Sequence, residues 1–166
     1  VESLLGFASP GKSSCEEIDA KALVAEAVEA ARVERCIADR PERWTIESRV
    51  ECRRFRGDRI KLRQALRNLV ANSLQAQADG GTVVVEVREE NGDVELRVHD
   101  AGPGFPESLR GRSGEPFLTT RAEGTGLGLS LVHAIAAIHG GGIEIRSGPG
   151  PLGGADVRIR IPRQPS

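Results

Sequence analysis

Residues 82–100 contain the feature that most constrains the fold, two segments of alternating residues joined by the dipeptide Asn91-Gly92. The alternation of apolar and polar residues over 82–90 and again over 94–100 predicts two strands, each with one buried face. Because Asn-Gly is favoured in two-residue hairpin turns, the segments are expected to pair as antiparallel neighbours. The chain must therefore contain a sheet, and the apolar face of that sheet has to be covered.

Three segments with helical periodicity are available to cover it. Residues 19–34 begin at a candidate N-cap, Asp19, and share one face among Leu23, Ala27, Ala30 and Ala31. Residues 58–77 begin at a second candidate cap, Asp58, and carry a stripe formed by Leu62, Ala65, Leu66, Leu69, Val70 and Ser73. Residues 127–139 predict a third helix, which the glycines at 140–142 should end.

The remaining segments complete a layered fold. Residues 44–52, 142–147 and 155–162 have the alternation of strands. We therefore expect the α+β class, a two-layer α/β sandwich with a mixed, mostly antiparallel sheet covered on one face by three helices. Residues 101–125 show no periodicity and are rich in Gly, Pro, Ser and Thr. A loop of this length inside a compact domain is usually a lid or a binding loop.

Composition and charge exclude several classes of protein. The chain has 166 residues, of which 39% are hydrophobic and 28% charged, and this balance suits one soluble domain. Its net charge of -1 gives no positive field for nucleic acid or membrane, and the basic stretch 53–67, without interleaved aromatics, is interpreted as a solvated helix face. No apolar run approaches the roughly 20 residues of a membrane span. Three widely spaced cysteines indicate reduced thiols in the cytoplasm.

Residues 6–13 read GFASPGKS and fit the phosphate-loop pattern G-x-x-x-x-G-K-[ST]. A working phosphate loop follows a buried strand and opens directly into a helix. Here only five residues precede the pattern, and helical periodicity begins beyond Asp19. Pro10 also lacks the N–H group that such a loop donates to phosphate. We expect residues 1–17 to be a linker instead, and residues 18–166 to form the domain.

Three motifs in the second half of the chain could carry chemistry together. Asn68 and Asn72 lie one helical turn apart, and an Asn amide oxygen suits Mg²⁺. Asp100 ends a strand in HDAGPGF, where it could accept a hydrogen bond from an exocyclic amine while nearby glycines allow a ligand to approach. The run GTGLGL at 124–129 leads into a helix, whose first N–H groups bind anions. Each motif alone is also compatible with an ordinary turn or helix surface.

The order and spacing of these motifs resemble the N, G1, F and G2 boxes of the family that joins DNA gyrase, Hsp90, histidine kinases and MutL. From about residue 18 to 162 the chain is most similar to the catalytic ATP-binding domain of bacterial sensor histidine kinases, especially over 57–76 and 115–147. Gln75-Ala76 resembles the nitrogen-regulator type, where many other members have Lys and an aromatic residue. Residues 154–156 read Gly-Ala-Asp where Gly-Thr-Thr is frequent.

The resemblance implies a site for Mg-ATP. Asn72 would coordinate Mg²⁺, with Asn68 assisting near the phosphates. Asp100 would read adenine N6, and Gly102 and Gly104 would flank the base. Residues 106–124 would be the ATP lid within the loop 101–125. The lid and the start of the last helix would bind the phosphates through Thr120, Arg121, Gly124, Thr125, Gly126, Leu127, Gly128 and Leu129.

The residue one turn before Asn72 separates kinases from ATPases in this family. Gyrase-like members have a Glu there as the general base for hydrolysis, whereas this chain has Asn68, which cannot accept a proton. The resemblance therefore implies slow hydrolysis and transfer of the γ-phosphate to a histidine on a separate dimerisation domain. None of His99, His133 and His139 lies in an acceptor motif, and each is expected to be structural or on the surface.

The expected partners follow from that reading. Because the chain starts at Val1 and contains no methionine, we expect it to be a piece of a longer protein. The piece would be monomeric and cytoplasmic, the parent a homodimer that could be membrane-anchored, and a response regulator receiver domain would act downstream. Two other functions stay open, namely an anti-sigma-type serine kinase of the same fold and a degenerate module that binds partners without using ATP.

Overall fold

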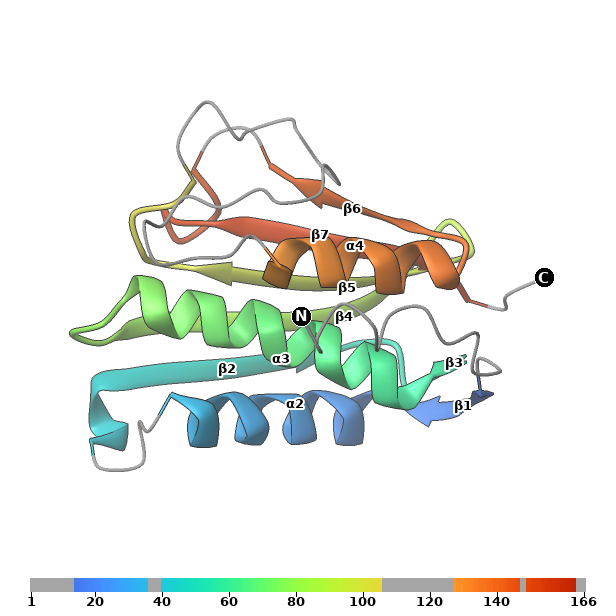
Figure 1. Cartoon of the computed structure of the whole chain (residues 1–166), viewed down its shortest axis with the longest axis horizontal. Helices are drawn as coiled ribbons and strands as arrows, with labels where there is room; N and C mark the ends of the chain where they lie inside the picture. Colours follow the sequence, from blue (N-terminus) through green and yellow to red (C-terminus); the bar gives the residue numbers. More distant parts are fainter. Residues whose placement is uncertain (1–13, 36–39, 106–126, 147–148, 164–166) are drawn as a thin grey trace.

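The computed structural model describes residues 14–35, 40–105, 127–146 and 149–163. Within these residues, three α-helices lie on one side of a five-stranded sheet (Figure 1). The strand order in the sheet is β2-β4-β5-β7-β6. The helices are α2 (Ala20–Glu34), α3 (Arg59–Ala76) and α4 (Leu127–Ile138), and the strands are β2 (Trp44–Val50), β4 (Gly81–Glu90), β5 (Asp93–Asp100), β6 (Gly142–Ile145) and β7 (Asp156–Pro162). The predicted α+β sandwich is confirmed.

The central hairpin forms where the sequence predicts it. Strands β4 and β5 pair antiparallel, with Val85 opposite Val98 and Glu90 opposite Asp93. Asn91 and Gly92 have φ values of 55° and 85°, as a two-residue hairpin turn of the primed type requires. Strand β2 is parallel to β4 and all other neighbours are antiparallel, so the sheet is mixed and mostly antiparallel.

Both predicted aspartate caps begin a helix. Asp19 Oδ1 accepts a hydrogen bond from the Ala22 N–H at 3.0 Å, and Asp58 Oδ1 accepts one from the Lys61 N–H at 3.1 Å. Each bond satisfies one of the N–H groups that lack a partner in the first turn of a helix. The stripe predicted for the second helix is buried in α3, where Ala71 and Leu74 extend it.

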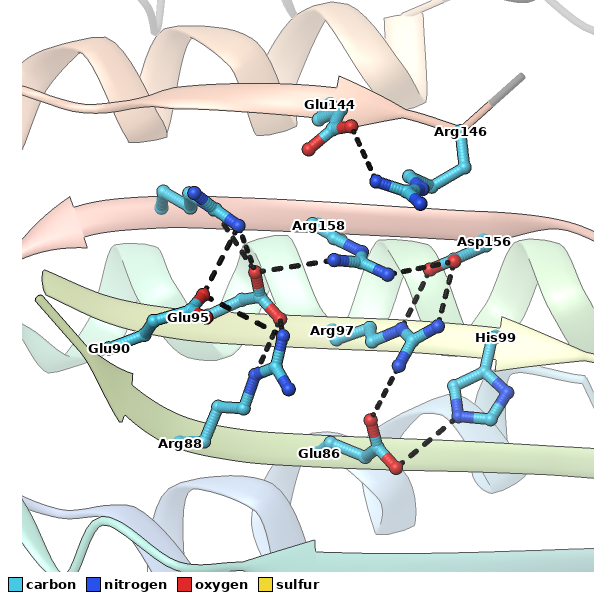
Figure 2. Close-up of polar contacts among 11 residues, drawn as sticks. Glu86, Arg88, Glu90, Glu95, Arg97, His99, Glu144, Arg146, Asp156 and Arg158 are labelled. Atoms are coloured by element: carbon cyan, nitrogen blue, oxygen red, sulfur yellow. Dashed lines mark hydrogen bonds and ion pairs between the residues drawn. The ribbon is translucent and has the colours of Figure 1, made fainter. Parts of the chain in front are cut away.

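Alternation along the strands divides the sheet into two different faces. On β5, Val94, Leu96 and Val98 belong to the core beneath the helices. The residues between them, such as Glu95 and Arg97, point to the opposite face and form ion pairs there (Figure 2). Because strand side chains alternate, Asp100 follows Val98 onto the helix face. The end of β5 thus places one carboxylate on the same side as α3.

Two short strands are not predicted by the sequence analysis. β1 (Cys15–Asp19) and β3 (Arg54–Asp58) pair antiparallel in a separate two-stranded sheet. The strand β1 begins inside the expected linker 1–17, and β3 occupies part of the stretch 53–67 that was interpreted as a helix face. That interpretation is wrong for Arg54–Asp58, where only Phe55, Gly57 and Asp58 are buried. Charged residues dominate both segments, and each contains a single buried large apolar side chain, Ile18 or Phe55, so apolar–polar alternation does not identify them.

Several predictions fall on residues outside the description. The phosphate-loop pattern at 6–13 lies there, as do residues 106–126, which include nearly all of the predicted lid. Among the residues that are described, no helix is long and apolar enough to cross a membrane.

Candidate nucleotide-binding site

Asp100 is the most firmly placed of the predicted site residues. Its side chain is buried at the end of β5, with 1% of the residue exposed. The carboxylate oxygen Oδ1 accepts hydrogen bonds from the Gly102 N–H at 3.0 Å and from the Ala155 N–H at 3.1 Å. The main chain of Asp100 is held as well, because its N–H donates to Ala155 O and its carbonyl accepts from Gly154 N–H, both at 3.0 Å. These bonds fix the direction of the carboxylate and leave Oδ2 outside all of them.

Glycines make this close arrangement possible. A Cβ atom at Gly102 would lie 3.1 Å from Asp100 Oδ1, and one at Gly154 would overlap the same oxygen and the Asp100 carbonyl. Gly104 has a φ of 74°, a conformation that favours glycine, and it packs against the backbone of Gly154. The sequence singled out Gly102 and Gly104 but did not assign Gly154 to the site. The substitution of Ala155 for the frequent Thr keeps its contact with Asp100 because that contact uses the backbone N–H.

Asn68 and Asn72 lie on α3, and both are half-buried. Asn72 faces the start of α4, since a Cβ atom at Gly128 would lie 3.4 Å from Asn72 Nδ2 and 3.9 Å from Oδ1. Asn68 Oδ1 accepts a hydrogen bond from Arg67 Nη2 at 3.0 Å. The structure therefore brings Asn72 together with the helix start that the sequence predicts to bind phosphate. A side chain at Gly128 would narrow that space.

The N-terminus of α4 is the segment that the sequence predicts to bind anions. The helix begins at Leu127, and the first N–H groups of any helix have no partner within it. Leu129 packs its side chain into the core beneath, so that any contact with a ligand is left to its backbone. Thr120, Arg121, Gly124, Thr125 and Gly126 lie outside the described residues.

Two of the three histidines are buried, and neither is suited to accept a phosphoryl group. His139 Nε2 accepts a hydrogen bond from the Asp58 N–H at 2.9 Å, while Nδ1 lies 2.7 Å from Ile135 O. An acceptor at Nε2 and a donor at Nδ1 assign the neutral tautomer with its proton on Nδ1. His99 is 2% exposed and lies on the face of the sheet away from the helices (Figure 2). The expected structural role fits both positions.

Charged groups on that opposite face of the sheet shift the pKa values of their neighbours. Burial lowers the pKa of His99, and the nearby Arg97 lowers it further, against the opposing effect of Glu86 at 3.6 Å. Burial by itself would raise the pKa of Asp156, but hydrogen bonds from Arg97 and Arg158 outweigh it and lower that pKa. Each lowered pKa favours one charge state at neutral pH, a neutral imidazole and an ionised carboxylate.

The described residues contain no group of three or more His, Cys, Asp or Glu side chains that could hold a metal ion. Mg²⁺ bound with phosphates usually takes few protein ligands, and an amide oxygen can be one of them. Asn72 offers such an oxygen next to the start of α4.

Comparison with known proteins identifies the family and several related kinases. The family described as histidine kinase-, DNA gyrase B- and HSP90-like ATPases matches residues 57–165. Sporulation kinase A of Bacillus subtilis (strain 168) is 40% identical over 108 residues, which are 65% of this chain and 18% of that protein. The catalytic domain of the histidine kinase ThkA superposes with a TM-score of 0.75 at 28% identity, over 92% of this chain and 97% of that one.

A second solved structure is full-length ShkA in complex with AMPPNP, with a TM-score of 0.78 at 25% identity. The match covers 99% of this chain and 35% of that one. The chain thus spans about a third of this kinase and less than a fifth of the sporulation kinase, whereas it matches nearly the whole of an isolated catalytic domain.

Proposed function

The chain belongs to the family of histidine kinase-, DNA gyrase B- and HSP90-like ATPases, and from this membership we propose that it is the catalytic domain of a sensor histidine kinase. In this role it binds Mg-ATP and supplies the γ-phosphate to a histidine on a separate dimerisation domain. The observation that carries the proposal is the fixed carboxylate of Asp100. It lies on the side of the sheet that the helices cover, the same side as Asn72 and the start of α4.

Asp100 is proposed to recognise the adenine base. Two backbone N–H groups engage Oδ1, so the carboxylate cannot rotate freely and Oδ2 is held in a constant direction. An oxygen of this kind accepts a hydrogen bond from the N6 amine of adenine and opposes a carbonyl at the same position of another base. Gly102 donates its N–H to the other carboxylate oxygen, Oδ1, and Gly104 packs against the backbone of Gly154, so both glycines belong to the loop that holds the carboxylate.

The phosphate end of the site is proposed to lie between α3 and α4. Asn72 offers an amide oxygen for Mg²⁺, and the missing side chain of Gly128 keeps the adjacent space open. Mg²⁺ held there would neutralise negative charge on the phosphates. Asn68 stands one turn away on α3, and the N–H groups of Leu127, Gly128 and Leu129 complete the anion site. Thr120, Arg121, Gly124, Thr125 and Gly126 are proposed to contribute from the lid.

Transfer to a protein acceptor is proposed rather than rapid hydrolysis, because the site lacks a base at the expected position. Asn68 stands where a hydrolytic member of the family has Glu, and its amide cannot take a proton from water. The acceptor histidine would come from the dimerisation domain of a homodimeric parent, with a response regulator receiver domain downstream. The reaction would take place in the cytoplasm, where the nucleotide is available.

Radiolabelled transfer tests this proposal. The chain is incubated with ATP labelled at the γ-phosphate and Mg²⁺, with and without the helical histidine domain of its parent. We expect acid-labile phosphohistidine on the added domain only, at a rate that falls by at least about tenfold in Asn72→Ala, a loss of about 1.4 kcal/mol. Gln64→Ala, an exposed change on the same helix, should retain the wild-type rate.

Two outcomes would contradict the proposal. Fast release of inorganic phosphate without the histidine domain would assign the chain to the hydrolytic members of the family. Acid-stable label on a serine of a supplied partner would instead support the serine kinase alternative.

A further inference from the structure

Gln77, which the sequence patterns do not mark, occupies the junction between the two halves of the site. It follows the last residue of α3 and is 7% exposed. Its carbonyl oxygen accepts hydrogen bonds from the indole N–H of Trp44 at 3.0 Å and from the Gly80 N–H at 2.9 Å. The main chain of this one residue therefore contacts the start of β2 and the turn that leads into β4.

Both polar atoms of the Gln77 side-chain amide form hydrogen bonds with backbone groups. Nε2 donates to Ser73 O at 3.3 Å and to Thr82 O at 3.2 Å, while Oε1 accepts from the Thr82 N–H at 3.1 Å. Since both carbonyls can only accept and the N–H can only donate, this pattern determines which end of the amide is oxygen. Ser73 is the neighbour of Asn72, so the amide joins the asparagine helix to the first residues of β4.

The connection continues from Thr82 to the loop that carries Asp100. Thr82 O accepts a second hydrogen bond, from the Ala101 N–H at 3.1 Å. The Cγ atom of Gln77 also packs under the same loop, where a Cβ atom at Gly102 would lie 3.1 Å from it. One side chain thus reaches the Asp100 loop by two routes, a shared carbonyl and a direct contact.

Glycine at position 81 is adapted to this arrangement. A Cβ atom there would overlap Oε1 of Gln77, so the amide occupies space that any other residue at 81 would fill. The two hydrogen bonds between the Gln77 side-chain amide and the Thr82 backbone therefore depend on Gln77 and on the glycine at position 81. Removal of this buried amide is expected to be destabilising. Each backbone group left without its hydrogen bond would stay buried, and its desolvation would no longer be compensated.

We propose that Gln77 is a positioning residue for base recognition, which holds the Asp100 loop at a set place relative to the end of α3. This inference rests on the proposed function, since it concerns the same site. Its specific consequence is that Gln77 controls discrimination between bases. Without the amide, the direction of Asp100 Oδ2 would no longer be fixed relative to the ring, and an adenine N6 amine would be preferred less strongly.

The test compares ADP with inosine diphosphate, which has a carbonyl oxygen in place of the N6 amine. Dissociation constants are measured with Mg²⁺ by displacement of a fluorescent ADP from the whole 166-residue chain. In Gln77→Met, which retains the length of the side chain but none of its hydrogen bonds, we expect the preference for ADP to fall about fivefold. Gln64→Met, the same exchange at an exposed position of α3, should retain the wild-type preference.

The ratio of the two constants separates positioning from stability. A residue that only stabilised the fold would lower the unfolding temperature and leave the ratio unchanged, and that result in Gln77→Met would overturn the inference. If Gln77→Met does not fold, Gln77→Glu carries the same test, because its carboxylate can still accept from Thr82 N–H but cannot donate to the two carbonyls. A wild-type chain that binds both nucleotides equally would refute the proposed adenine site itself, and the inference with it.

Discussion

The two faces of the central sheet are built from the same strands by opposite chemistry. Beneath the helices, β5 contributes Val94, Leu96 and Val98 to an apolar core. On the other face, the alternating residues of the same strand are Glu95, Arg97 and His99. Glu95 and His99 are buried, with 1% and 2% exposed, and Arg97 is half-buried. Burial alone therefore does not distinguish the faces; what differs is how the buried groups find partners.

Most charged groups on this face pair with one another (Figure 2), whereas both ring nitrogens of His99 and Nε of Arg158 are buried without a hydrogen-bond partner. Glu95 accepts from Arg88 at 2.9 Å and from Arg160 at 3.0 Å, with Arg158 at 3.7 Å. Asp156 pairs with Arg97 at 2.8 Å, and Arg97 reaches Glu86 at 3.1 Å. The strands β4, β5 and β7 are thereby linked across the sheet by side chains as well as by backbone bonds. In contrast, the helix face ends in a carboxylate, Asp100, whose oxygen Oδ2 lies outside the bonds that fix it.

The largest effect is expected from the apolar face. Leu96→Ala removes a fully buried side chain between the sheet and the helices, and we expect a loss of about 3 kcal/mol in the free energy of unfolding. Urea denaturation followed by circular dichroism measures it. A loss below about 1 kcal/mol would show that the helices are not held mainly by this layer.

The neighbouring residue tests the charged face. Glu95→Gln leaves the shape nearly unchanged but removes the charge that Arg88, Arg158 and Arg160 share, of which only Arg158 is deeply buried. Because Arg88 and Arg160 can turn toward solvent, we expect a loss of about 2 kcal/mol, less than a fully buried pair would give. Denaturation under the same conditions measures it, and an unchanged stability would mean that the pairs add nothing to the fold.

The pH dependence should reveal the buried imidazole on the charged face. Because the pKa of His99 is lowered in the folded state, the unfolded chain binds its proton first as pH falls. Stability from this group is complete above the unfolded pKa of about 6.5 and is lost as pH falls from there toward the folded pKa, by at most about 1.4 kcal/mol per pH unit. Removal of the imidazole in His99→Gln should flatten this part of the curve. An identical slope in both proteins would contradict the account.

A separate loss is expected at lower pH. The pKa values of Glu86 and Asp156 are lowered despite their burial. His99, which becomes charged as pH falls, and then Arg97 lower the pKa of Glu86, whereas hydrogen bonds from Arg97 and Arg158 lower that of Asp156. A carboxylate with a lowered pKa stabilises the fold above its unfolded pKa, and the stabilisation disappears as pH falls through the folded value. The His99→Gln variant should keep the part of this acid limb that comes from Asp156, below about pH 4, and lose part of the contribution of Glu86.

The smallest effect is expected at the edge of the charged face. Glu144 and Arg146 on and beside β6 approach within 3.3 Å, but their side chains are 43% and 49% exposed. Glu144→Gln should change the unfolding free energy by less than about 0.5 kcal/mol because solvent and salt screen an exposed pair. An effect as large as that of Glu95→Gln would show that charge, and not burial of the pair, sets the stability of this face.

Local patterns in the sequence predict most of this architecture. Alternation and Asn91-Gly92 predict the hairpin, Asp19 and Asp58 predict the starts of two helices, and Asp100 is predicted at the end of a strand, where β5 ends. These features depend on neighbours in the chain. The pairing of β1 with β3 does not, because it joins residues about forty positions apart in strands of five residues each.

The unpredicted parts of the site depend on distant partners in the same way. Gly154 and Ala155 contact Asp100 from the start of β7, and the amide of Gln77 meets Thr82 only after the chain has turned. Nothing in the residue types around Gln77 distinguishes it from the exposed Gln75 two positions earlier. The charged face was equally hidden, since alternating charges in a strand are also typical of a solvated surface.

The most direct test of the account compares adjacent residues on opposite faces of β5. A fluorescent ADP is titrated with Mg²⁺ into wild type, Asp100→Asn and His99→Gln. In Asp100→Asn, the amide oxygen would accept from Gly102 and Ala155 N–H and direct its NH₂ group toward the base amine, so we expect affinity to fall by at least about tenfold, or 1.4 kcal/mol. His99→Gln should bind within about twofold of wild type. Equal affinities for all three proteins, or a larger loss at His99, would place the nucleotide elsewhere and contradict the assignment of the site to the helix face.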